Sequence, residues 1–297
     1  MTVPASFDDW MRNVQSTMEE TLFSFLPVGK LSSSSLHESM RYAVLDGGKR
    51  IRPLLVFATG HLFNARAPAL ARAAAAVEMI HAYSLVHDDM PCMDNDVLRR
   101  GKPTVHVEFG EATALLAGDA LQAQAFVVLS NQQCDPVLVV EMMRLLSRAA
   151  GAAGMCGGQA IDLASVGKSL TVDELENMHR LKTGALLTAS VFLGAYCSKI
   201  PTEQEKNALN AYAKAIGLAF QVVDDILDVT ADSAELGKTA GKDSADNKPT
   251  YVSLLGLEES RQLAEKLRND AYAALSIFDE KADYLRQLAD LVVRRKK

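Results

Sequence analysis

The sequence predicts an all-α fold in which residues 1–297 form a single domain. Three observations lead to this prediction. Prolines are few, 9 in 297 residues, and several stand where a helix should begin. Alanine is abundant, which favours helix and permits close helix packing. No stretch of alternating β-branched residues indicates a strand convincingly, although VFLGAY and FVVL are ambiguous by this criterion.

Proline and glycine mark the ends of several predicted helices. Pro53, Pro68 and Pro136 each introduce an apolar-rich stretch, and proline suits the first helical turn because its missing N–H has no acceptor there. Gly47-Gly48 is typical of a helix C-terminus and is expected to close the helix that precedes it.

Two segments match the capping box, in which a threonine and a glutamate three residues later satisfy each other's backbone N–H. They are Thr171 with Glu174 and Thr202 with Glu205. In chain order, the predicted helices cover residues 6–26, 33–46, 53–63, 68–90, 111–131, 136–153, 172–182, 184–197, 202–231, 250–278 and 280–294.

Two looser stretches, 27–35 and 231–249, separate predicted helices. Neither is long enough or rich enough in Pro, Gly and Ser to divide the chain into domains. The second stretch contains glycine and lysine and directly follows an acidic motif. Long loops inside a compact domain are more often functional lids than accidents, and a disordered surface loop is the alternative.

Composition excludes several classes of protein. A net charge of −6 and a pI near 5.6 leave no broad basic surface for a nucleic-acid partner. No charge-free apolar run approaches the roughly 18 residues of a membrane span, and the N-terminus does not resemble a signal peptide. Cys92, Cys134, Cys156 and Cys197 lack C-x-x-C or zinc spacing, which indicates reduced thiols. We therefore expect a cytoplasmic protein without zinc or a disulfide framework.

Two acidic clusters, HDDMPCMDND (87–96) and DDILD (224–228), stand in strongly apolar surroundings. An unpaired buried charge there would cost on the order of several kcal/mol. We find no lysine or arginine three or four positions away on either helix to offset these charges. Another cation is therefore implied.

The second cluster forms one polar stripe. At about 100° per residue, Gln221, Asp224 and Asp228 share a helix face, and the two aspartates lie one turn apart. Oxygen ligands without Cys or His select a hard cation, with Mg²⁺ the default, and Mg²⁺ completes its shell with water and phosphate oxygens. A phosphorylated substrate is therefore predicted. No EF-hand loop is present, and chance acidic patches on solvated helices are the alternative.

The first cluster forms a similar stripe. His81, Ser84 and Asp88 lie on one face, and His81 is about 10 Å from Asp88 along the axis. Asp94 would point away on an ideal helix. Pro91 should end or distort the helix, which could bring Asp94 back beside Asp88.

Basic residues gather at four places that could meet a phosphate: GGKRIRP (47–53), RRGK (99–102), KTG (182–184) and Lys238 in the candidate lid. The first of these places cations just before a helix N-terminus, which favours an anion. It lacks the P-loop pattern.

The chain resembles the trans-prenyl diphosphate synthases in an ordered set of motifs: GGKRIRP, EMIHAYSLVHDDMPCMDNDVLRRGKPT, GGQAIDL, KTG, FQVVDDILD and LGKTAGKD. The match covers about residues 40 to 250 and is closest to the short-chain bacterial branch, the farnesyl and geranylgeranyl diphosphate synthases. The resemblance implies the isoprenoid synthase fold, with about ten or more helices around a central cavity, and a homodimer.

The resemblance also implies a reaction. Isopentenyl diphosphate condenses head-to-tail with dimethylallyl and geranyl diphosphate to give (2E,6E)-farnesyl diphosphate. The allylic diphosphate ionises, the double bond of isopentenyl diphosphate attacks the carbocation, and the released pyrophosphate removes a proton. Mg²⁺, commonly three ions, assists departure of the diphosphate.

Single residues take roles from the same resemblance. The metal ligands are Asp88, Asp94, Asp224 and Asp228, and the catalytic set is Asp88, Asp94, Lys182 and Asp224. The allylic diphosphate is gripped by Arg99, Lys182, Thr183, Gln221 and Lys238. Isopentenyl diphosphate is held by Lys49, Arg52, His81 and Arg100.

Two features keep two interpretations each. Gln159 and Asp162 of GGQAID either line the cavity, as the resemblance implies, or make structural hydrogen bonds. The basic C-terminus, residues 294–297, either folds over the isopentenyl diphosphate site or is a solvated tail.

Product length is assigned from the residue five positions before Asp88. Tyr83 at this position, with the inserted Pro91-Cys92, resembles farnesyl synthases, whereas a smaller residue resembles geranylgeranyl synthases. Tyr83 lies about 7.5 Å back along the helix, and ideal geometry aligns Ser84 with Asp88 better than Tyr83. A geranylgeranyl diphosphate synthase is the alternative.

Three other functions compete. A terpene cyclase shares metal-driven ionisation, but it usually replaces the second DDxxD with an Asn/Ser/Glu motif and does not need GGKRIRP. A non-catalytic regulatory subunit should have lost one acidic cluster. A Mg²⁺- or diphosphate-binding protein without turnover is distinguished only by an assay.

Overall fold

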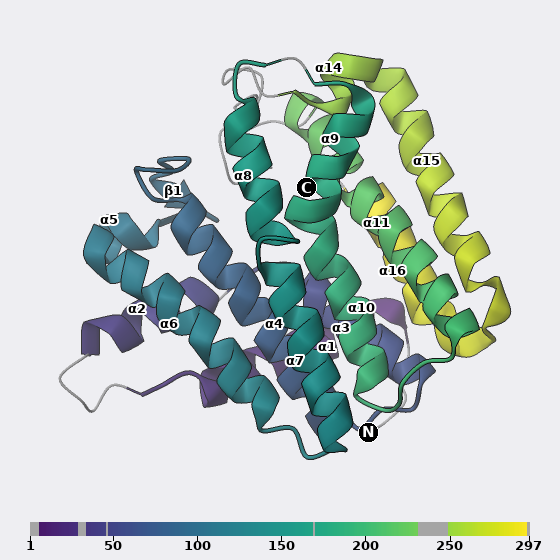
Figure 1. The fold of residues 1–297 in the computed structure, drawn as a ribbon, viewed down its shortest axis with the longest axis horizontal. Coiled ribbons are helices and arrows are strands. Elements are labelled where there is room, and N and C mark those ends of the chain that lie inside the picture. The colour runs from purple at the N-terminus through teal and green to yellow at the C-terminus, as the bar shows by residue number, and fades with distance from the viewer. Residues whose placement is uncertain (1–5, 29–33, 46, 169, 231–248, 296–297) are drawn as a thin grey trace.

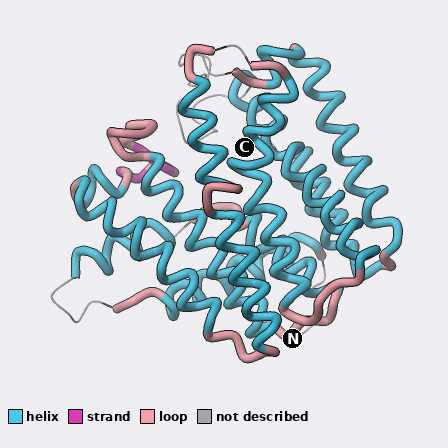
Figure 2. Tube along the Cα trace, in the orientation of Figure 1, coloured by secondary structure: helices cyan, strands magenta, loops and turns pink. Residues whose placement is uncertain are grey.

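A computed structural model describes residues 6–28, 34–45, 47–168, 170–230 and 249–295. This part of the chain is nearly all helix, and the all-α prediction is confirmed (Figures 1 and 2). The longer helices are α1 (Phe7–Phe25), α2 (Ser34–Val44), α3 (Ile51–Leu62), α4 (Ala67–Asp88), α6 (Glu111–Ser130), α7 (Pro136–Ala150), α8 (Met155–Ser165), α10 (Ala185–Tyr196), α11 (Glu203–Thr230), α15 (Leu257–Ala274) and α16 (Asp283–Arg294). The short elements are α5 (Val105–Phe109), α9 (Val172–His179), α14 (Tyr251–Leu255), the π-helical turn η1 (Arg180–Gly184) and the 3-10 turns η2 (Leu275–Ile277) and η3 (Glu280–Ala282).

Helix α4 is the central element of the core. It packs against α1, α3, α6 and α10. Four consecutive alanines, residues 73–76, are fully buried along it, because their small side chains let neighbouring helices approach closely. Burial on so many sides fixes the C-terminal end of α4, where the first acidic cluster begins.

A two-stranded hairpin follows that cluster and was not predicted. Strands β1 (Leu98–Arg99) and β2 (Lys102–Pro103) pair antiparallel, and Figure 2 shows them in magenta. Arg100 and Gly101 form the turn with φ values of 53° and 75°, the left-handed geometry that tight hairpins use. The hairpin turns the chain back toward the end of α4.

Several predicted helix ends are wrong by a few residues, and some helices were joined together or not predicted. The helix predicted over 33–46 ends at Val44. The helix predicted over 250–278 is broken at Gly256, whose φ of 89° ends α14 before α15 begins. Helices α5 and α8 were not predicted at all. Both capping boxes are confirmed: Glu174 and Glu205 each accept the backbone N–H of their threonine, at 2.8 and 2.7 Å.

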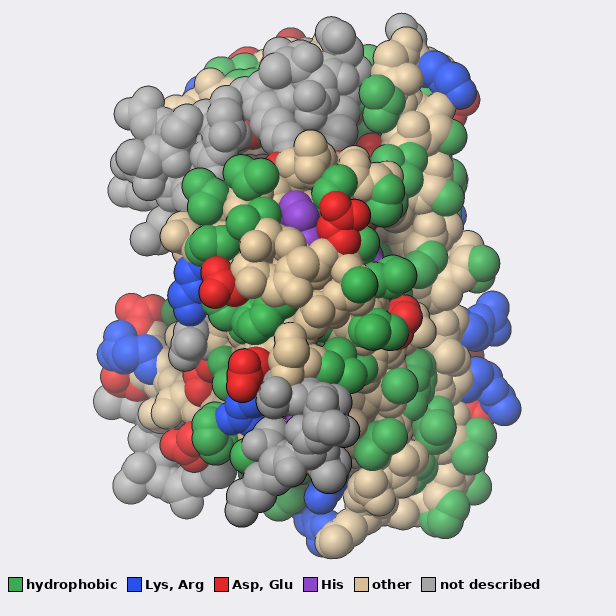
Figure 3. Space-filling model, turned by 90° about the vertical axis from the view of Figure 1, so that its left-hand side faces the viewer, with side chains coloured by type: hydrophobic (Ala, Val, Ile, Leu, Met, Phe, Trp, Pro, Cys, Tyr) green, Lys and Arg blue, Asp and Glu red, His purple; other side chains and the backbone are tan. Residues whose placement is uncertain are grey.

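Within the described residues, two helices are long and apolar enough by length and composition to cross a membrane. They are α4, with 72% of its apolar window buried, and α6, with 39% buried. Burial accounts for α4 as a core helix. On α6, Leu115, Leu116 and Val127 are about half exposed, at 48%, 55% and 51%. Figure 3 shows the side of the molecule where hydrophobic side chains reach the surface with few charged ones between them.

Candidate active site

A cavity of about 450 Å³ opens beside the C-terminal end of α4. Its walls come from α3, α4, α6, α8 and η1. Seven residues predicted for the site line it: Arg52, His81, Tyr83, Ser84, Asp88, Lys182 and Thr183. Most of the other lining residues are apolar or cysteine: Leu85, Met90, Cys92, Met93, Leu115, Met155, Cys156, Ala160 and Leu163. The cavity therefore has charged groups at one part of its wall and an apolar interior.

The first acidic cluster turns back on itself where α4 ends. Asp88 is the last residue of α4, and the chain then reverses through a series of turns around Pro91. The Asp94 N–H donates to the Asp88 carbonyl oxygen at 2.8 Å. This reversal agrees with the predicted distortion at Pro91 and brings Asp94 beside Asp88.

The side chain of Asp88 lies in an environment that opposes its charge. Burial raises the pKa of Asp88 to about 6; the charge of Lys182 acts against this rise, and that of Asp94 adds to it. The carboxylate therefore gains from any nearby cation.

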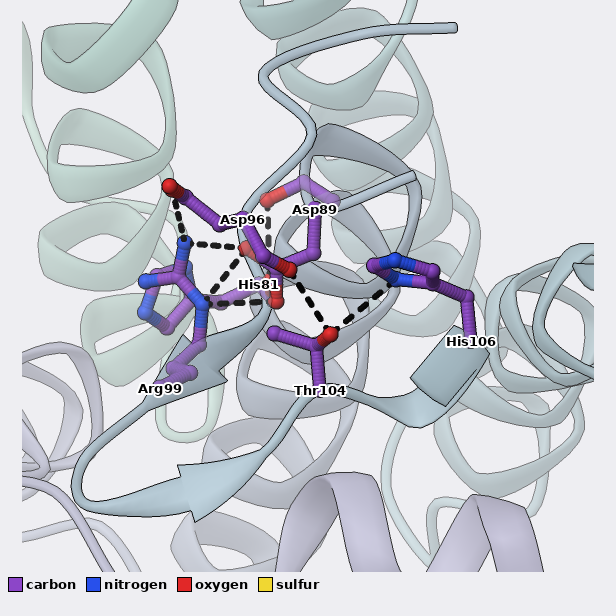
Figure 4. Close-up of polar contacts among 7 residues, drawn as sticks. His81, Asp89, Asp96, Arg99, Thr104 and His106 are labelled. Carbon is purple, nitrogen blue, oxygen red and sulfur yellow. Dashed lines mark hydrogen bonds and ion pairs between the residues drawn. The ribbon is translucent and has the colours of Figure 1, made fainter. Parts of the chain in front are cut away.

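Asp89 has its own cation, supplied by the hairpin. The Arg99 guanidinium donates to both Asp89 carboxylate oxygens, with Nη2 at 2.6 Å from Oδ1 and Nε at 2.8 Å from Oδ2 (Figure 4). Asp96 lies 4.0 Å from the same guanidinium, three residues before it in sequence. The expectation that this cluster has no nearby basic partner is therefore wrong for Asp89 and Asp96, because the hairpin folds Arg99 back. In this structure Arg99 does not line the cavity.

Thr104, which directly follows β2, also contacts the same acidic cluster. Its hydroxyl donates to the Asp96 carbonyl oxygen at 2.7 Å and lies 3.0 Å from His106 Nδ1 (Figure 4). The hairpin that carries Arg99 is thus held to the acidic cluster both by Arg99 itself and by Thr104.

The second acidic cluster is held by partners from two directions. Asp224 Oδ1 accepts from Arg295 Nη2 at 2.6 Å. The Arg295 guanidinium also lies 3.8 Å from the centre of the Phe220 ring. Asp225 is buried and accepts the Tyr251 N–H at 2.7 Å. The described part of the basic C-terminus therefore contacts the second cluster.

The stripe predicted on α11 is only partly realised. Gln221 Nε2 donates to Asp225 Oδ1 at 3.2 Å, and Thr183 Oγ1 donates to Gln221 Oε1 at 3.3 Å. Asp228 is buried, with 6% of its surface exposed. Gln221, Asp224 and Asp228 do not line the cavity beside Asp88, and Thr183 connects the cavity to them.

Several arginines lie close to His81, at another part of the site. Burial and the charges of Arg52, Arg100, Arg99 and Arg50 lower the pKa of His81 well below its ordinary value, so the ring is neutral at pH 7. Burial also lowers the pKa of Arg52 and of Arg100, and the buried Arg52 Nε has no hydrogen-bond partner in the structure. These groups form a cationic end that a diphosphate would suit.

The GGKRIRP segment has a structural part and a site part. Arg50, buried with a φ of 54°, donates to Glu78 at 2.7 Å and to Glu19 at 2.5 Å, which anchors the segment. A Cβ on Gly48 would lie 2.9 Å from an Arg100 guanidinium nitrogen, and φ there is 93°, so the loop needs glycine. The side chain of Lys49 is exposed.

In the GGQAID motif, one residue makes a structural contact and the other lines the cavity, so each of the two interpretations applies to one residue. Asp162 accepts from Lys182 Nζ at 2.5 Å, which is a structural ion pair. Gln159 lines the cavity, is 9% exposed, and neither its Oε1 nor its Nε2 has a hydrogen-bond partner in the structure.

Carboxylate oxygens are the donors that Mg²⁺ prefers, and the raised pKa of Asp88 marks a site that a cation would stabilise. Within the described ranges, no three His, Cys, Asp or Glu side chains meet closely enough to hold a metal by themselves. Asp88 and Asp94, which lie together at the end of α4, have the oxygen donors that suit Mg²⁺, and such an ion would need further ligands from elsewhere. Lys238 lies outside the described residues.

Sequence reasoning missed three contributors: Asp89, Asp225 and Arg295. The first two are second members of the DD pairs, and their partners come from segments whose fold the sequence did not reveal. The RRKK terminus was the only signal for Arg295.

Comparisons with known proteins agree with this geometry. The polyprenyl synthetase family model matches residues 33–285. The farnesyl diphosphate synthase of Escherichia coli is 49% identical over 284 residues, which are 94% of this chain and 95% of that protein. An FPP/GFPP synthase from Zymomonas mobilis superposes with a TM-score of 0.87 at 43% identity, over 98% of this chain and 100% of the other. A Helicobacter pylori geranyltransferase complexed with magnesium and isoprenyl diphosphate superposes with a TM-score of 0.85 at 34% identity, over 99% and 98%.

The buried charge of Asp88 predicts a pH-dependent cost to stability. Because burial raises the pKa of Asp88 from 3.8 to about 6, the folded protein holds this proton more tightly than the unfolded chain. The stability that the proton contributes is complete below about pH 4 and is lost as the pH rises to about 6. We expect Asp88→Asn to raise the free energy of unfolding of the metal-free protein by about 2 kcal/mol more at about pH 7.5 than at about pH 4.5.

Urea unfolding in EDTA measures this difference. Asp270→Asn, at an exposed position of α15, is the control and should shift stability by less than about 0.5 kcal/mol at both pH values. An effect of Asp88→Asn that is the same at both pH values would contradict the prediction.

Proposed function

Because the chain belongs to the polyprenyl synthetase family and is a prenyltransferase, we propose that it transfers dimethylallyl and geranyl groups to isopentenyl diphosphate, with (2E,6E)-farnesyl diphosphate as its main product. The observation that carries this proposal is the cavity at the end of α4. It joins Asp88, Lys182 and Thr183 to an apolar interior of about 450 Å³. A diphosphate suits the charged part and a prenyl chain suits the interior.

Three Mg²⁺ ions per site would be held by the carboxylates of Asp88, Asp94, Asp224 and Asp228. Bound Mg²⁺ would withdraw charge from the departing diphosphate and lower the cost of breaking its C–O bond. That diphosphate would be oriented by polar side chains of the protein, namely Arg99, Lys182, Thr183, Gln221 and Lys238. The contact between Thr183 and Gln221 supports this set, because it connects the cavity to α11.

Isopentenyl diphosphate would be bound at the cationic end by Lys49, Arg52, His81 and Arg100. Since burial and neighbouring arginines lower the pKa of His81, its ring would act as a neutral hydrogen-bonding group, and the arginines and lysine would supply the charge. The buried Arg52 Nε without a partner supports a ligand here. The double bond would attack the allylic carbocation, and the released pyrophosphate would take the proton.

The apolar interior limits the product. Tyr83 is 5% exposed and lines the cavity, as does Ser84. A buried aromatic ring at this place favours termination at fifteen carbons over continuation to geranylgeranyl diphosphate.

We also propose a cytoplasmic homodimer, each chain folded as a single polyprenyl synthase domain. The support is the apolar surface of α6, defined by Leu115, Leu116 and Val127, which is about half exposed. Exposed apolar patches commonly mark protein interfaces. Leu115 also lines the cavity, so a second copy packed on α6 would cover the cavity wall as well.

The proposed activity predicts Mg²⁺-dependent condensation. Purified protein with labelled isopentenyl diphosphate, dimethylallyl diphosphate and Mg²⁺ should give farnesol as the main product after dephosphorylation. EDTA, or Asp224→Asn, should reduce incorporation by at least about 10²-fold. Binding of the diphosphates without any condensation would overturn the proposal in favour of a binding protein.

Tyr83→Ala should lengthen the product toward geranylgeranyl diphosphate, because it removes a buried ring from the cavity wall. Product chain length measured by chromatography tests this. Tyr272→Ala, on α15 and outside the cavity lining, controls for general loosening and should leave the product at fifteen carbons. An unchanged product from Tyr83→Ala would reject Tyr83 as the length-limiting residue.

Leu116→Lys should shift the protein from dimer to monomer, because it places a charge in the proposed interface. Sedimentation velocity at micromolar concentration measures the change. Ile277→Lys, at a position that is 45% exposed in η2, is the matched control and should stay dimeric. A monomeric unmodified protein would contradict the dimer.

A further inference from the structure

The Tyr83 hydroxyl contacts a residue of α8 on another wall of the cavity. Its hydroxyl lies 3.4 Å from the sulfur of Cys156, although the two residues are 73 positions apart in sequence. Tyr83 comes from α4 and Cys156 from the first turn of α8, and both line the cavity. The contact therefore bridges two helices across the apolar interior.

The Tyr83 ring is fixed from its other side. The His87 ring packs edge-on against it, with centroids 5.8 Å apart at an angle of 74°. His87 Nε2 in turn lies 3.0 Å from the Leu115 carbonyl oxygen of α6. A Cβ on Gly118 would lie 2.0 Å from His87 Nε2, so this arrangement requires glycine there. Helices α4 and α6 thus hold one side of the Tyr83 ring, and Cys156 of α8 contacts its hydroxyl.

Cys156 is also held in a defined position relative to the charged groups of the cavity. Two residues after it, a Cβ on Gly158 would lie 2.1 Å from the backbone nitrogen of Lys182. Helix α8 therefore packs backbone to backbone against η1, which carries Lys182 and Thr183. The separation between the diphosphate-binding groups and Cys156 is set by this rigid contact.

We propose that Cys156 is a product-length determinant, which forms with Tyr83 a two-residue wall that stops the growing prenyl chain. This inference rests on the proposed function. The thiol of Cys156 is small enough to leave room for the Tyr83 ring, and it closes the gap between α4 and α8. Without the sulfur the ring loses its stop and the cavity extends past it. A larger side chain at 156 fills part of the space that the second isoprene unit needs.

Substitutions at position 156 test the wall by product length. Cys156→Ala should raise the ratio of C20 to C15 product at least fivefold (roughly a gain of 1 kcal/mol in relative barrier). Cys156→Ser, whose hydroxyl still reaches Tyr83, should stay within about twofold of the unmodified protein. Cys156→Leu should shift product from C15 toward C10. Cys134→Ala, outside the cavity lining, is the matched cysteine control and should change nothing.

A structural role alone would alter stability and total rate but would not order the products by side-chain size. Total incorporation of isopentenyl diphosphate and thermal unfolding are therefore measured in the same series. If the unmodified protein does not condense, the proposed function fails. If it makes C15 and the 156 variants all keep its C20 to C15 ratio, the function stands and the wall is overturned.

Tyr83→Phe supplies an independent route if Cys156→Ala does not fold. It keeps the ring and removes the hydroxyl, which contacts the sulfur and also hydrogen-bonds the Gln122 side chain, so it should raise the C20 fraction in the same direction. Combining Tyr83→Phe with Cys156→Ala should add little further, because both remove one contact. Additive effects of the two substitutions would contradict a shared wall.

Discussion

Carboxylates that stand on apolar helices require cations, and this fold supplies them from distant segments. The pairs are Glu78 with Arg50, Asp89 with Arg99, Asp162 with Lys182 and Asp224 with Arg295. Removing one partner of a fully buried pair such as Glu78 with Arg50 costs about 3–5 kcal/mol, whereas the pair of Asp224 with Arg295 contributes less because the Asp224 side chain is 43% exposed. The GGKR segment, the hairpin, η1 and the C-terminus are each fixed by such a pair, so this requirement positions most of the site.

The π-helical turn η1 carries two polar groups of the candidate site, Lys182 and Thr183. Helices α9 and α10 run into each other through η1, which carries the KTG motif. A π-turn inserts a residue into the helical register and changes the direction of the side chains at that point. Here it lets Lys182 reach Asp162 on α8 while Thr183 reaches Gln221 on α11. Lys182 and Thr183 are adjacent in sequence, and through this turn their side chains contact two different helices, α8 and α11.

Local signals predicted the helices well, since proline, alanine and capping residues act within a few positions of where they stand. The stripe of His81, Ser84 and Asp88 also followed from helical geometry alone, and all three line the cavity. Asp89 and Arg99 could not be paired from sequence, because the hairpin that joins them depends on the left-handed turn at Arg100 and Gly101. The contact of Arg295 with Asp224 joins residues 71 positions apart, which no periodicity predicts.

The group of residues around His81 is positively charged, whereas the chain as a whole is negatively charged. The protein carries a net charge of −6, yet burial and the charges of four nearby arginines lower the pKa of His81. Their mutual repulsion is tolerated because Glu19 and Glu78 neutralise Arg50 at the back of the group. Arg52 lines the cavity, and among the described residues neither Arg52 nor Arg100 forms an ion pair with these two carboxylates, which hydrogen-bond Arg50 instead. A low-dielectric wall concentrates such a field, so small diphosphates are attracted although the surface as a whole repels extended polyanions.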